Sequence, residues 1–234
     1  MKIGIYGLEG FSQGKSNIVD ERIKVLEQMF KSAKRVYIQA DIVTEEPFLK
    51  EADGIIAQEG SKLVLIMTDL EFVETRLERS ADEQEKAMLR RFKEHLGKES
   101  LLSQLELSEA EKKAVSGYPL LTLKPVFFAG QADLENKEKL LFEAYNSFGY
   151  ISFFTAGEKD AHAWSIRKGA NAWEASGAIH SDIQRGFIRA EVVGYGDLTK
   201  DGGMNQARSN NHLRLENKEY TVQDGDIITF RFNK

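Results

Sequence analysis

The sequence predicts an α/β fold, in which a small parallel or mixed sheet is covered by helices and a smaller α+β domain follows. Three observations support this prediction. Short apolar segments alternate with amphipathic segments in the first part of the chain, as they do in βαβ units. A long charged stretch, Asp69–Gly97, is rich in helix-forming residues and has no Gly or Pro inside it. From Gly149 onward, short alternating segments and frequent glycines replace the long helical patterns.

The first domain is expected to be built on short, buried strands. Continuous apolar runs are typical of parallel sheets, and a proline is tolerated at the first residue of a strand. The strand candidates are Lys2–Tyr6, Arg35–Gln39, Gly54–Ala57, Lys62–Thr68 and Pro125–Ala129. Helices are predicted over Ile18–Lys31, where apolar residues recur at helical spacing, and over Glu46–Ala52. Together these elements predict a sheet with helices on its faces.

The charged stretch predicts a pair of antiparallel helices inserted into this domain. Apolar residues recur at helical spacing on both sides of Ser80–Glu83, but in different registers, so two helices are expected to fold back on each other. A capping box, in which Ser108 precedes Glu111 by three residues, then begins a shorter helix that ends near Gly117. The predicted helical hairpin therefore occupies about residues 69–117.

The last part of the chain is predicted to form a separate, β-grasp-like α+β domain. A helix over Leu140–Phe148 leads into it, so we divide the chain into residues 1–148 and 149–234. Its strand candidates are Ile151–Thr155, Ala161–Ser165, Phe187–Val193, Glu219–Val222 and Ile227–Phe232. Asp224-Gly225-Asp226 marks a turn before the last strand, and the polar segment Lys200–Asn211 is expected to be a loop.

Composition excludes several classes of protein. The net charge of −5 argues against a general affinity for nucleic acids, although it does not exclude a local basic face. No cysteine is present, so a disulfide framework and a thiolate metal site are excluded, and the four histidines show no ligand spacing. The longest apolar run, Leu63–Met67, is far too short to span a bilayer. We therefore expect a cytoplasmic protein without a membrane partner.

A near-match to a phosphate-binding loop follows the first predicted strand. The P-loop has four residues between its first glycine and the Gly-Lys-Ser/Thr end, whereas here Gly7 leaves six and Gly10 leaves three. A helix directly after the loop would direct its N–H groups at a phosphate. The candidate ligands of a nucleotide are Gly10, Gly14, Lys15 and Ser16, with the Ser16 hydroxyl on a magnesium ion if a nucleotide binds. The alternative is a solvated glycine-rich turn.

Basic residues in the last domain are the candidates for contact with RNA. They are Arg167, Lys168, Arg185 and Arg189. Dispersed cations of this kind more often belong to a solvated surface, since lysines and arginines are abundant on every protein exterior. The aromatic residues around them, Trp164 and Trp173 among others, are expected in the core and at the rim of the domain.

Several segments resemble the YchF family of Obg-like ATPases. The matching motifs lie at the start of the helical stretch, at its return and along most of the last domain. They are Thr68-Asp69-Leu70-Glu71-Phe72, Leu121-Thr122-Leu123-Lys124-Pro125, Phe153-Phe154-Thr155-Ala156-Gly157, Gly177-Ala178-Ile179-His180-Ser181-Asp182-Ile183-Gln184-Arg185-Gly186 and Asp224-Gly225-Asp226-Ile227-Ile228. The resemblance implies a P-loop GTPase-like sheet with an inserted helical hairpin and a C-terminal TGS-like β-grasp domain. It also implies contact of that domain with the ribosome or RNA, and ATP or GTP with magnesium as ligands.

The chain departs from the family pattern in its nucleotide-binding part. The segment before the last domain is much shorter, and the family's switch aspartate is represented only by Asp41-Ile42-Val43, without its glycine. Gly130-Gln131-Ala132-Asp133 replaces the family's base-reading motif and lacks its Asn. We assign no catalytic residue and expect no efficient hydrolysis, because the switch and base-reading motifs are missing and no residue is identified that would position the attacking water.

Three hypotheses about function remain open at this point. The first is a degenerate YchF-like protein that binds the ribosome, with weak or lost nucleotide binding. The others are an active NTPase with a rearranged loop and an interaction adaptor that does not bind RNA. Loss of the switch segments would expose apolar surface, so a homo-oligomer is also predicted.

Overall fold

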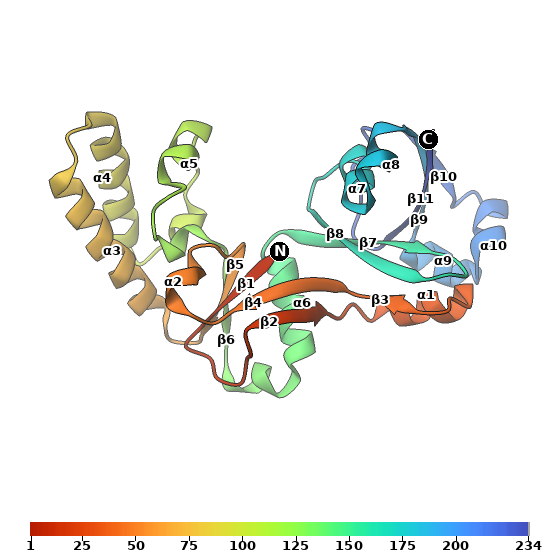
Figure 1. Ribbon diagram of the computed structural model, residues 1–234, viewed down its shortest axis with the longest axis horizontal. Helices are drawn as coiled ribbons and strands as arrows, with labels where there is room; N and C mark the ends of the chain where they lie inside the picture. Colours follow the sequence, from red (N-terminus) through yellow and green to blue (C-terminus); the bar gives the residue numbers. More distant parts are fainter. Residues whose placement is uncertain (234) are drawn as a thin grey trace. The chain divides into compact units, whose positions relative to one another are not determined.

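The computed structural model describes residues 1–233, and the chain forms two compact units (Figure 1). The first unit comprises Met1–Ser16 and Ala40–Leu140. The second comprises Asn17–Gln39 and the chain from Leu141 onward. This division differs from the predicted boundary after residue 148, because a short N-terminal segment belongs to the second unit.

The first unit is built on a five-stranded sheet with the strand order β2-β4-β1-β5-β6. The strands are β1 (Lys2–Tyr6), β2 (Gly14–Ile18), β4 (Ile38–Val43), β5 (Gly54–Gln58) and β6 (Val126–Ala129). β1 pairs in parallel with β4 and β5, and β5 pairs in parallel with β6. Ile3, Ile55 and Ile56 are fully buried, as expected for a parallel sheet. The predicted α/β class is therefore confirmed, and the short helix α2 (Glu46–Leu49) begins where it was expected.

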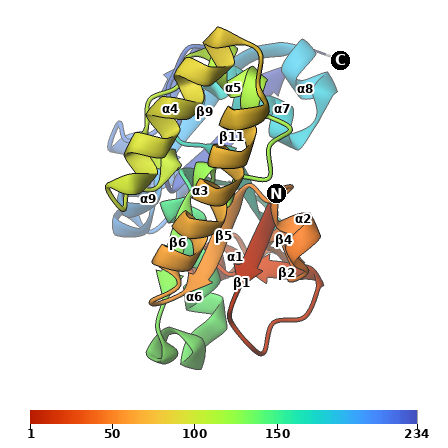
Figure 2. The same ribbon diagram turned by 90° about the vertical axis from the view of Figure 1, so that its left-hand side faces the viewer.

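The predicted helical hairpin is present and begins earlier than expected (Figure 2). Its helices are α3 (Lys62–Arg79) and α4 (Glu83–Gly97), and Asp82 caps α4 by accepting a hydrogen bond from the Gln84 N–H at 2.8 Å. The prediction of a strand over Lys62–Thr68 is wrong. Short apolar runs do not distinguish a strand from a helix, and here burial follows the helical period, with Leu65, Ile66 and Val73 inside.

The chain returns from the hairpin through short helical segments. They are the 3₁₀ turn η1 (Leu102–Gln104), α5 (Glu109–Val115), η2 (Leu121–Leu123), η3 (Gln131–Asn136) and α6 (Lys137–Ser147). The predicted capping box of α5 is confirmed, since the Glu111 N–H donates to Ser108 and the Glu111 carboxylate accepts from the Ser108 N–H. Apolar residues of α3, α4, η1, α5 and η2 form one core around Phe92 and Leu96.

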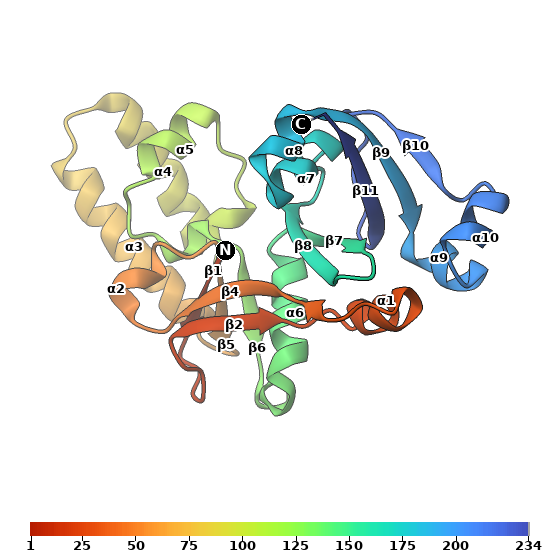
Figure 3. The ribbon, with the colours of Figure 1, turned by 45° about the vertical axis from the view of Figure 1, so that its right-hand side comes forward.

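The second unit is built on a six-stranded sheet with the order β10-β9-β11-β7-β8-β3 (Figure 3). Its strands are β3 (Arg35–Val36), β7 (Tyr150–Ala156), β8 (Ala161–Arg167), β9 (Phe187–Gly194), β10 (Arg214–Glu216) and β11 (Asp226–Phe232). β7 and β8 form an antiparallel hairpin, whereas β11 runs parallel to β7 and antiparallel to β9. The predicted smaller α+β domain is thus confirmed.

Helices cover both faces of this second sheet. They are α1 (Arg22–Phe30), α7 (Ala172–Ile179), α8 (Ser181–Arg185), α9 (Tyr195–Asp201) and α10 (Met204–Ser209). α1 and α7 lie on opposite faces of the β7–β8 hairpin (Figures 1 and 3). Residues 1–233 contain no helix that is both long and apolar enough to span a membrane.

Three local predictions are wrong. The helix expected over Ile18–Lys31 begins only at Arg22, because Gly14–Ile18 is extended and forms β2. Glu219–Val222 is no strand and contributes only a bridge between Thr221 and Asn171. The loop expected over Lys200–Asn211 contains the end of α9 and the whole of α10. Two glycines with positive φ, Gly202 and Gly203, separate these helices.

Candidate functional site

A pocket of about 660 Å³ lies at the carboxyl ends of β1, β5 and β6. The ends of neighbouring parallel strands meet at one edge of the sheet, which is where α/β proteins commonly bind ligands. The loop after β1, the residues after β5 and the segment after β6 supply its walls. The lining residues are Gly7, Leu8, Glu9, Gly10, Gln58, Glu59, Ala129, Gly130, Gln131, Leu134 and Lys137.

Glycines allow the backbone to approach side chains closely in this pocket. Gly10 has a φ of 80°, and a Cβ there would lie 2.7 Å from Lys137 Nζ. The Lys137 ammonium donates a hydrogen bond to the Gly10 carbonyl and lies 5.3 Å from the centre of the Phe11 ring. A Cβ on Gly130 would lie 2.7 Å from a carboxylate oxygen of Glu59. A side chain at Gly10 would therefore collide with Lys137, and a side chain at Gly130 would collide with Glu59.

The charges around the pocket do not favour a polyphosphate. Among its described lining residues, Glu9 and Glu59 are acidic and only Lys137 is basic. Phosphate sites instead collect N–H donors and cations around the anion. The only glycine of the predicted ligand set that lines the pocket is Gly10.

The remaining predicted phosphate ligands lie on an edge strand. Gly14, Lys15 and Ser16 belong to β2 and are not among the described residues that line the pocket. Successive N–H groups of a strand point in opposite directions, so they do not converge on one phosphate. α1 begins at Arg22, so no helix start lies directly after Ser16. Asp41 is an exposed residue of β4 and is also absent from the described lining residues.

Sequence reasoning missed Lys137 and Glu59. Glu59 directly follows β5, and Lys137 is the first residue of α6. The rule that carboxyl ends of parallel strands meet could have identified Glu59. Nothing local in the sequence indicates that Lys137 reaches Gly10, which is 127 positions away in the chain.

The four basic candidates of the second unit do not form one patch. Arg167 lies opposite Tyr150 in the β7–β8 hairpin, whereas Arg189 lies opposite Arg231 in the pairing of β9 and β11. Ile227 of β11 is level with Phe154 of β7. Tyr150 lies four residues before Phe154, and Arg231 lies four residues after Ile227. Arg167 and Arg189 are therefore about eight residues, or roughly 26 Å, apart along the strand direction.

The immediate surroundings of these basic residues also differ. The Arg167 guanidinium donates to the Phe148 carbonyl at 3.0 Å and stacks over Tyr150 at 3.9 Å. Arg185 is exposed and paired with Asp182. Lys168 and Arg189 are exposed. Arg189 faces Arg231 directly across the strands, and like charges in this position repel each other. This cross-strand arginine pair was not identified from the sequence.

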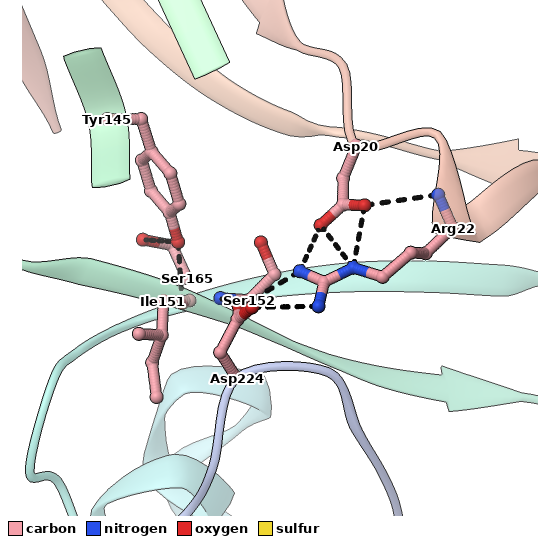
Figure 4. Close-up of polar contacts among 7 residues, drawn as sticks. All are labelled: Asp20, Arg22, Tyr145, Ile151, Ser152, Ser165 and Asp224. Carbon is pink, nitrogen blue, oxygen red and sulfur yellow. Dashed lines mark hydrogen bonds and ion pairs between the residues drawn. The ribbon is translucent and has the colours of Figure 1, made fainter. Parts of the chain in front are cut away.

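A network of hydrogen bonds and ion pairs in the second unit joins α1 to the turn before β11 (Figure 4). Arg22 donates to Asp20 at 2.7 and 2.9 Å and to Asp224 at 2.8 and 2.9 Å. Asp224 also accepts from the Ser152 N–H at 3.1 Å. Burial alone would lower the pKa of the Arg22 guanidinium, but its hydrogen bonds to Asp20 and Asp224 raise it. Arg22 is therefore a permanent positive charge that links separate segments.

Tyr145 forms a second buried contact next to this network (Figure 4). Its hydroxyl donates to the Ile151 carbonyl at 2.5 Å and lies 3.2 Å from Ser165 Oγ. Burial raises the pKa of Tyr145 to about 12. The hydroxyl thus stays protonated at neutral pH, and its role is to hold α6 against β7.

The histidines have structural partners. His180 accepts from the Asp182 N–H at 3.0 Å and caps α8. His212 lies 2.7 Å from Asp201, and His162 stacks on Trp164 with ring centres 3.7 Å apart. Burial lowers the pKa of His162. In the part of the chain that the structure describes, no three His, Asp or Glu side chains are grouped to hold a metal ion.

Comparison with known proteins identifies similar sequences over both units. The family model YchF-GTPase_C, described as a protein of unknown function (DUF933), matches residues 150–233. A Bacillus subtilis (strain 168) protein named "Ribosome-binding ATPase YchF" is 34% identical, and the match covers 78% of this chain and 68% of that protein. A Haemophilus ducreyi protein of the same name is 29% identical, with 85% and 71% covered.

The fold is also similar to that of a solved structure, the Schizosaccharomyces pombe YchF GTPase. The TM-score is 0.76 at 19% sequence identity, and the match covers 99% of this chain and 97% of that chain. The alignment with the Bacillus subtilis protein runs over 248 residues, which exceeds the 234 residues of this chain. That relative therefore contains residues that have no counterpart here.

Proposed function

Because this chain belongs to the YchF family, we propose that it is a ribosome-associated binding protein whose nucleotide affinity is weak or lost. The observation that carries the proposal is the uneven similarity between its two parts. The family model extends over almost all of the chain after Gly149, whereas Gly14, Lys15 and Ser16, three of the four predicted phosphate ligands, lie on an edge strand.

The C-terminal part is the proposed ribosome-binding part. Several relatives are named ribosome-binding ATPases, and the family model matches residues 150–233. Arg185 and Arg189 lie near the start of β9, and Arg231 is the cross-strand neighbour of Arg189. Arg231 is paired with Glu191, whereas Arg189 is exposed and can contact an RNA phosphate, which supports this edge as the contact.

The proposed loss of nucleotide affinity rests on the charge and backbone of the pocket. Glu9 and Glu59 would repel the phosphates of ATP or GTP. The single positive charge of Lys137 does not balance the combined negative charge of two carboxylates and a polyphosphate. Efficient hydrolysis also requires a magnesium ligand and a positioned water. We therefore propose a binding protein without efficient hydrolysis.

Co-sedimentation with purified ribosomes tests the ribosome contact. We expect the protein in the ribosomal pellet at low salt and less of it at higher salt, because cation–phosphate contacts weaken as salt rises. The Arg185→Glu, Arg189→Glu variant should be depleted from the pellet. Arg208→Glu, an exposed change in α10, is the matched control and should still sediment.

Two outcomes would contradict this part of the proposal. Absence of the protein from the pellet at low and moderate salt would favour an adaptor that does not bind RNA. Undiminished sedimentation of the double variant would exclude this edge as the contact. Lys168→Glu then tests the other basic group, at the end of β8.

A second candidate function is nucleotide binding, either next to Lys137 in the pocket or at Lys15 of the predicted loop. A ligand present at about 100 times its Kd would stabilise the protein by about 2.7 kcal/mol. We expect magnesium-ATP and magnesium-GTP at millimolar concentration to leave the melting temperature unchanged. A rise that disappears in Lys137→Gln would establish binding in the pocket, and a rise that disappears in Lys15→Ala would establish binding at the predicted loop.

A further inference from the structure

The first unit contains a second pocket, of about 350 Å³, where the chain returns from the helical hairpin. Leu102, Val115 and Leu120 are buried beneath it. Leu105, Leu107 and Leu123 line it and are only partly buried, so apolar surface remains open to solvent. The pocket can therefore bury an apolar side chain of a ligand.

Three lysines line this pocket, and no acidic residue is among its described lining residues. Each lysine comes from a different segment. Lys50 follows α2, Lys112 lies on α5, and Lys124 follows η2. Lys112 is paired with Glu109 at 2.6 Å, whereas Lys50 and Lys124 form no salt bridge with any carboxylate of residues 1–233. The rim thus has an excess of positive charge, although Glu51 interacts electrostatically with Lys50 and Glu109 is paired with Lys112.

The polar side chains at the pocket already have partners. The Tyr118 hydroxyl donates to Glu85, and the Ser116 hydroxyl donates to the Lys113 carbonyl at 2.8 Å. Glu51, the neighbour of Lys50, is paired with Lys2 at 2.6 Å. What remains for a ligand is a leucine-lined floor and the lysine ammonium groups.

We propose that this pocket docks an acidic peptide segment of another protein, with a leucine or phenylalanine side chain as its anchor. An apolar anchor would cover the exposed faces of Leu105, Leu107 and Leu123. Carboxylates spaced along an extended or helical peptide could pair with lysines on three separate segments at once. A single headgroup, such as the carboxylate of a fatty acid, would satisfy only one of them.

The pocket does not fit a single-stranded nucleic acid. Such sites combine cations with exposed aromatic rings on which bases stack. Tyr118 is the only aromatic residue among the described lining residues. Its ring packs against Phe72 at 5.3 Å, and Arg76 lies 5.8 Å from its centre. The proposed ligand is therefore a protein segment, and this site is separate from the proposed ribosome contact.

Fluorescence anisotropy with a labelled peptide tests the proposal on the full-length protein. The probe is a twelve-residue peptide (about three helical turns) in which leucines are spaced among aspartates and glutamates. We expect saturable binding that weakens as salt is raised. Two peptides serve as probe controls, one with lysine in place of every acidic residue and one with serine in place of every leucine. Neither should bind.

Variants of the rim lysines assign the binding to this pocket. Reversing two charges that contact the ligand should raise the Kd at least about tenfold, so we expect this for Lys50→Glu, Lys124→Glu. Lys113→Glu is the matched control, because Lys113 is exposed on α5 but does not line the pocket. Its Kd should stay within about twofold of the unmodified protein. Unchanged melting temperatures of both variants would show that they are folded.

The proposal is overturned by any of three results. The first is that the acidic peptide does not bind the unmodified protein. The second is that the double variant binds it as tightly as the control variant does. The third is that the basic or the leucine-free peptide binds equally well, since recognition would then depend on neither the lysines nor the leucine-lined floor.

Discussion

Arg22 and Asp224 are 202 positions apart in the sequence, and their side chains form two hydrogen bonds, at 2.8 and 2.9 Å. The same guanidinium holds Asp20, which is 1% exposed. This contact fastens the start of α1 to the turn before the last strand. It explains why residues 17–39 belong to the second unit and not to the first.

Removal of the Arg22 charge should destabilise the second unit. Arg22→Met leaves the buried Asp20 carboxylate without its cation, and we expect a loss of about 2 kcal/mol in the free energy of unfolding. Denaturant unfolding at neutral pH measures it. The control is Lys24→Met, because the exposed pair of Lys24 with Glu21 should contribute little to the free energy of unfolding. Equal effects of the two changes would contradict a structural role for Arg22.

The turn before β11 should not tolerate a side chain at Gly225. Gly225 has a φ of 87°, and a Cβ there would lie 2.7 Å from Arg22 Nη1. We expect Gly225→Ala to lower the free energy of unfolding by about 1–2 kcal/mol, from backbone strain and displacement of Arg22. Gly117→Ala has no neighbour within 4 Å of the new Cβ and should be nearly neutral. A neutral Gly225→Ala would show that the turn can rearrange.

The tip of the helical hairpin should lose stability in acid. Hydrogen bonds from Arg76, Ser80 and Tyr118 hold the pKa of Glu85 at about 2, below its ordinary value of 4.5. The stabilisation by ionised Glu85 is therefore complete above pH 4.5 and is lost as the pH falls towards 2. Allowing for partial exposure, we expect Glu85→Gln to cost about 1–2 kcal/mol at neutral pH.

The pH dependence of this difference provides the check. Stability curves of the unmodified protein and Glu85→Gln should converge between pH 4.5 and about 2. Glu83→Gln, at an exposed residue of the same helix, is the control and should change stability little at any pH. A constant difference between unmodified protein and Glu85→Gln across this range would contradict the assigned pKa.

The exposed apolar face of α3 supports the predicted self-association. Leu63, Val64 and Met67 lie on one side of this helix and are 50%, 53% and 67% exposed. Sedimentation velocity should detect a dimer or larger species at micromolar concentration, and Val64→Lys, Met67→Lys should return the protein to a monomer. Thr75→Lys, at an exposed position further along α3, should not. A monomeric unmodified protein would exclude self-association through this face.

Sequence patterns predicted the elements whose signals are local. β1, β5 and the capped helix α5 follow from apolar periodicity and from a capping box. Lys62–Thr68 could not be assigned correctly, because its apolar run is equally compatible with a buried strand and with the first turns of a helix. Gly14–Ile18 was assigned to a phosphate loop for its Gly-Lys-Ser sequence, while its place at the sheet edge depends on pairing with β4.

The candidate sites depended more strongly on distant contacts. Only Gly10 of the predicted phosphate ligands lines the first pocket, since Lys137 and Glu59 come from segments that the fold brings together. The four basic candidates were selected by composition, but strand register separates Arg167 from Arg189. Register and pairing are properties of the folded sheet, and no short segment of the sequence encodes them.

The position of residues 17–39 has a consequence for synthesis of the protein on the ribosome. This segment is synthesised long before its partners, because β3 pairs with β8 and Arg22 bonds with Asp224, which lies 202 positions later. The second unit therefore closes only after Asp224 has been translated. Until then the nascent α1 exposes Ile23 and Leu26, which are buried in the finished fold. Early protection of this helix by a chaperone would favour correct folding over aggregation.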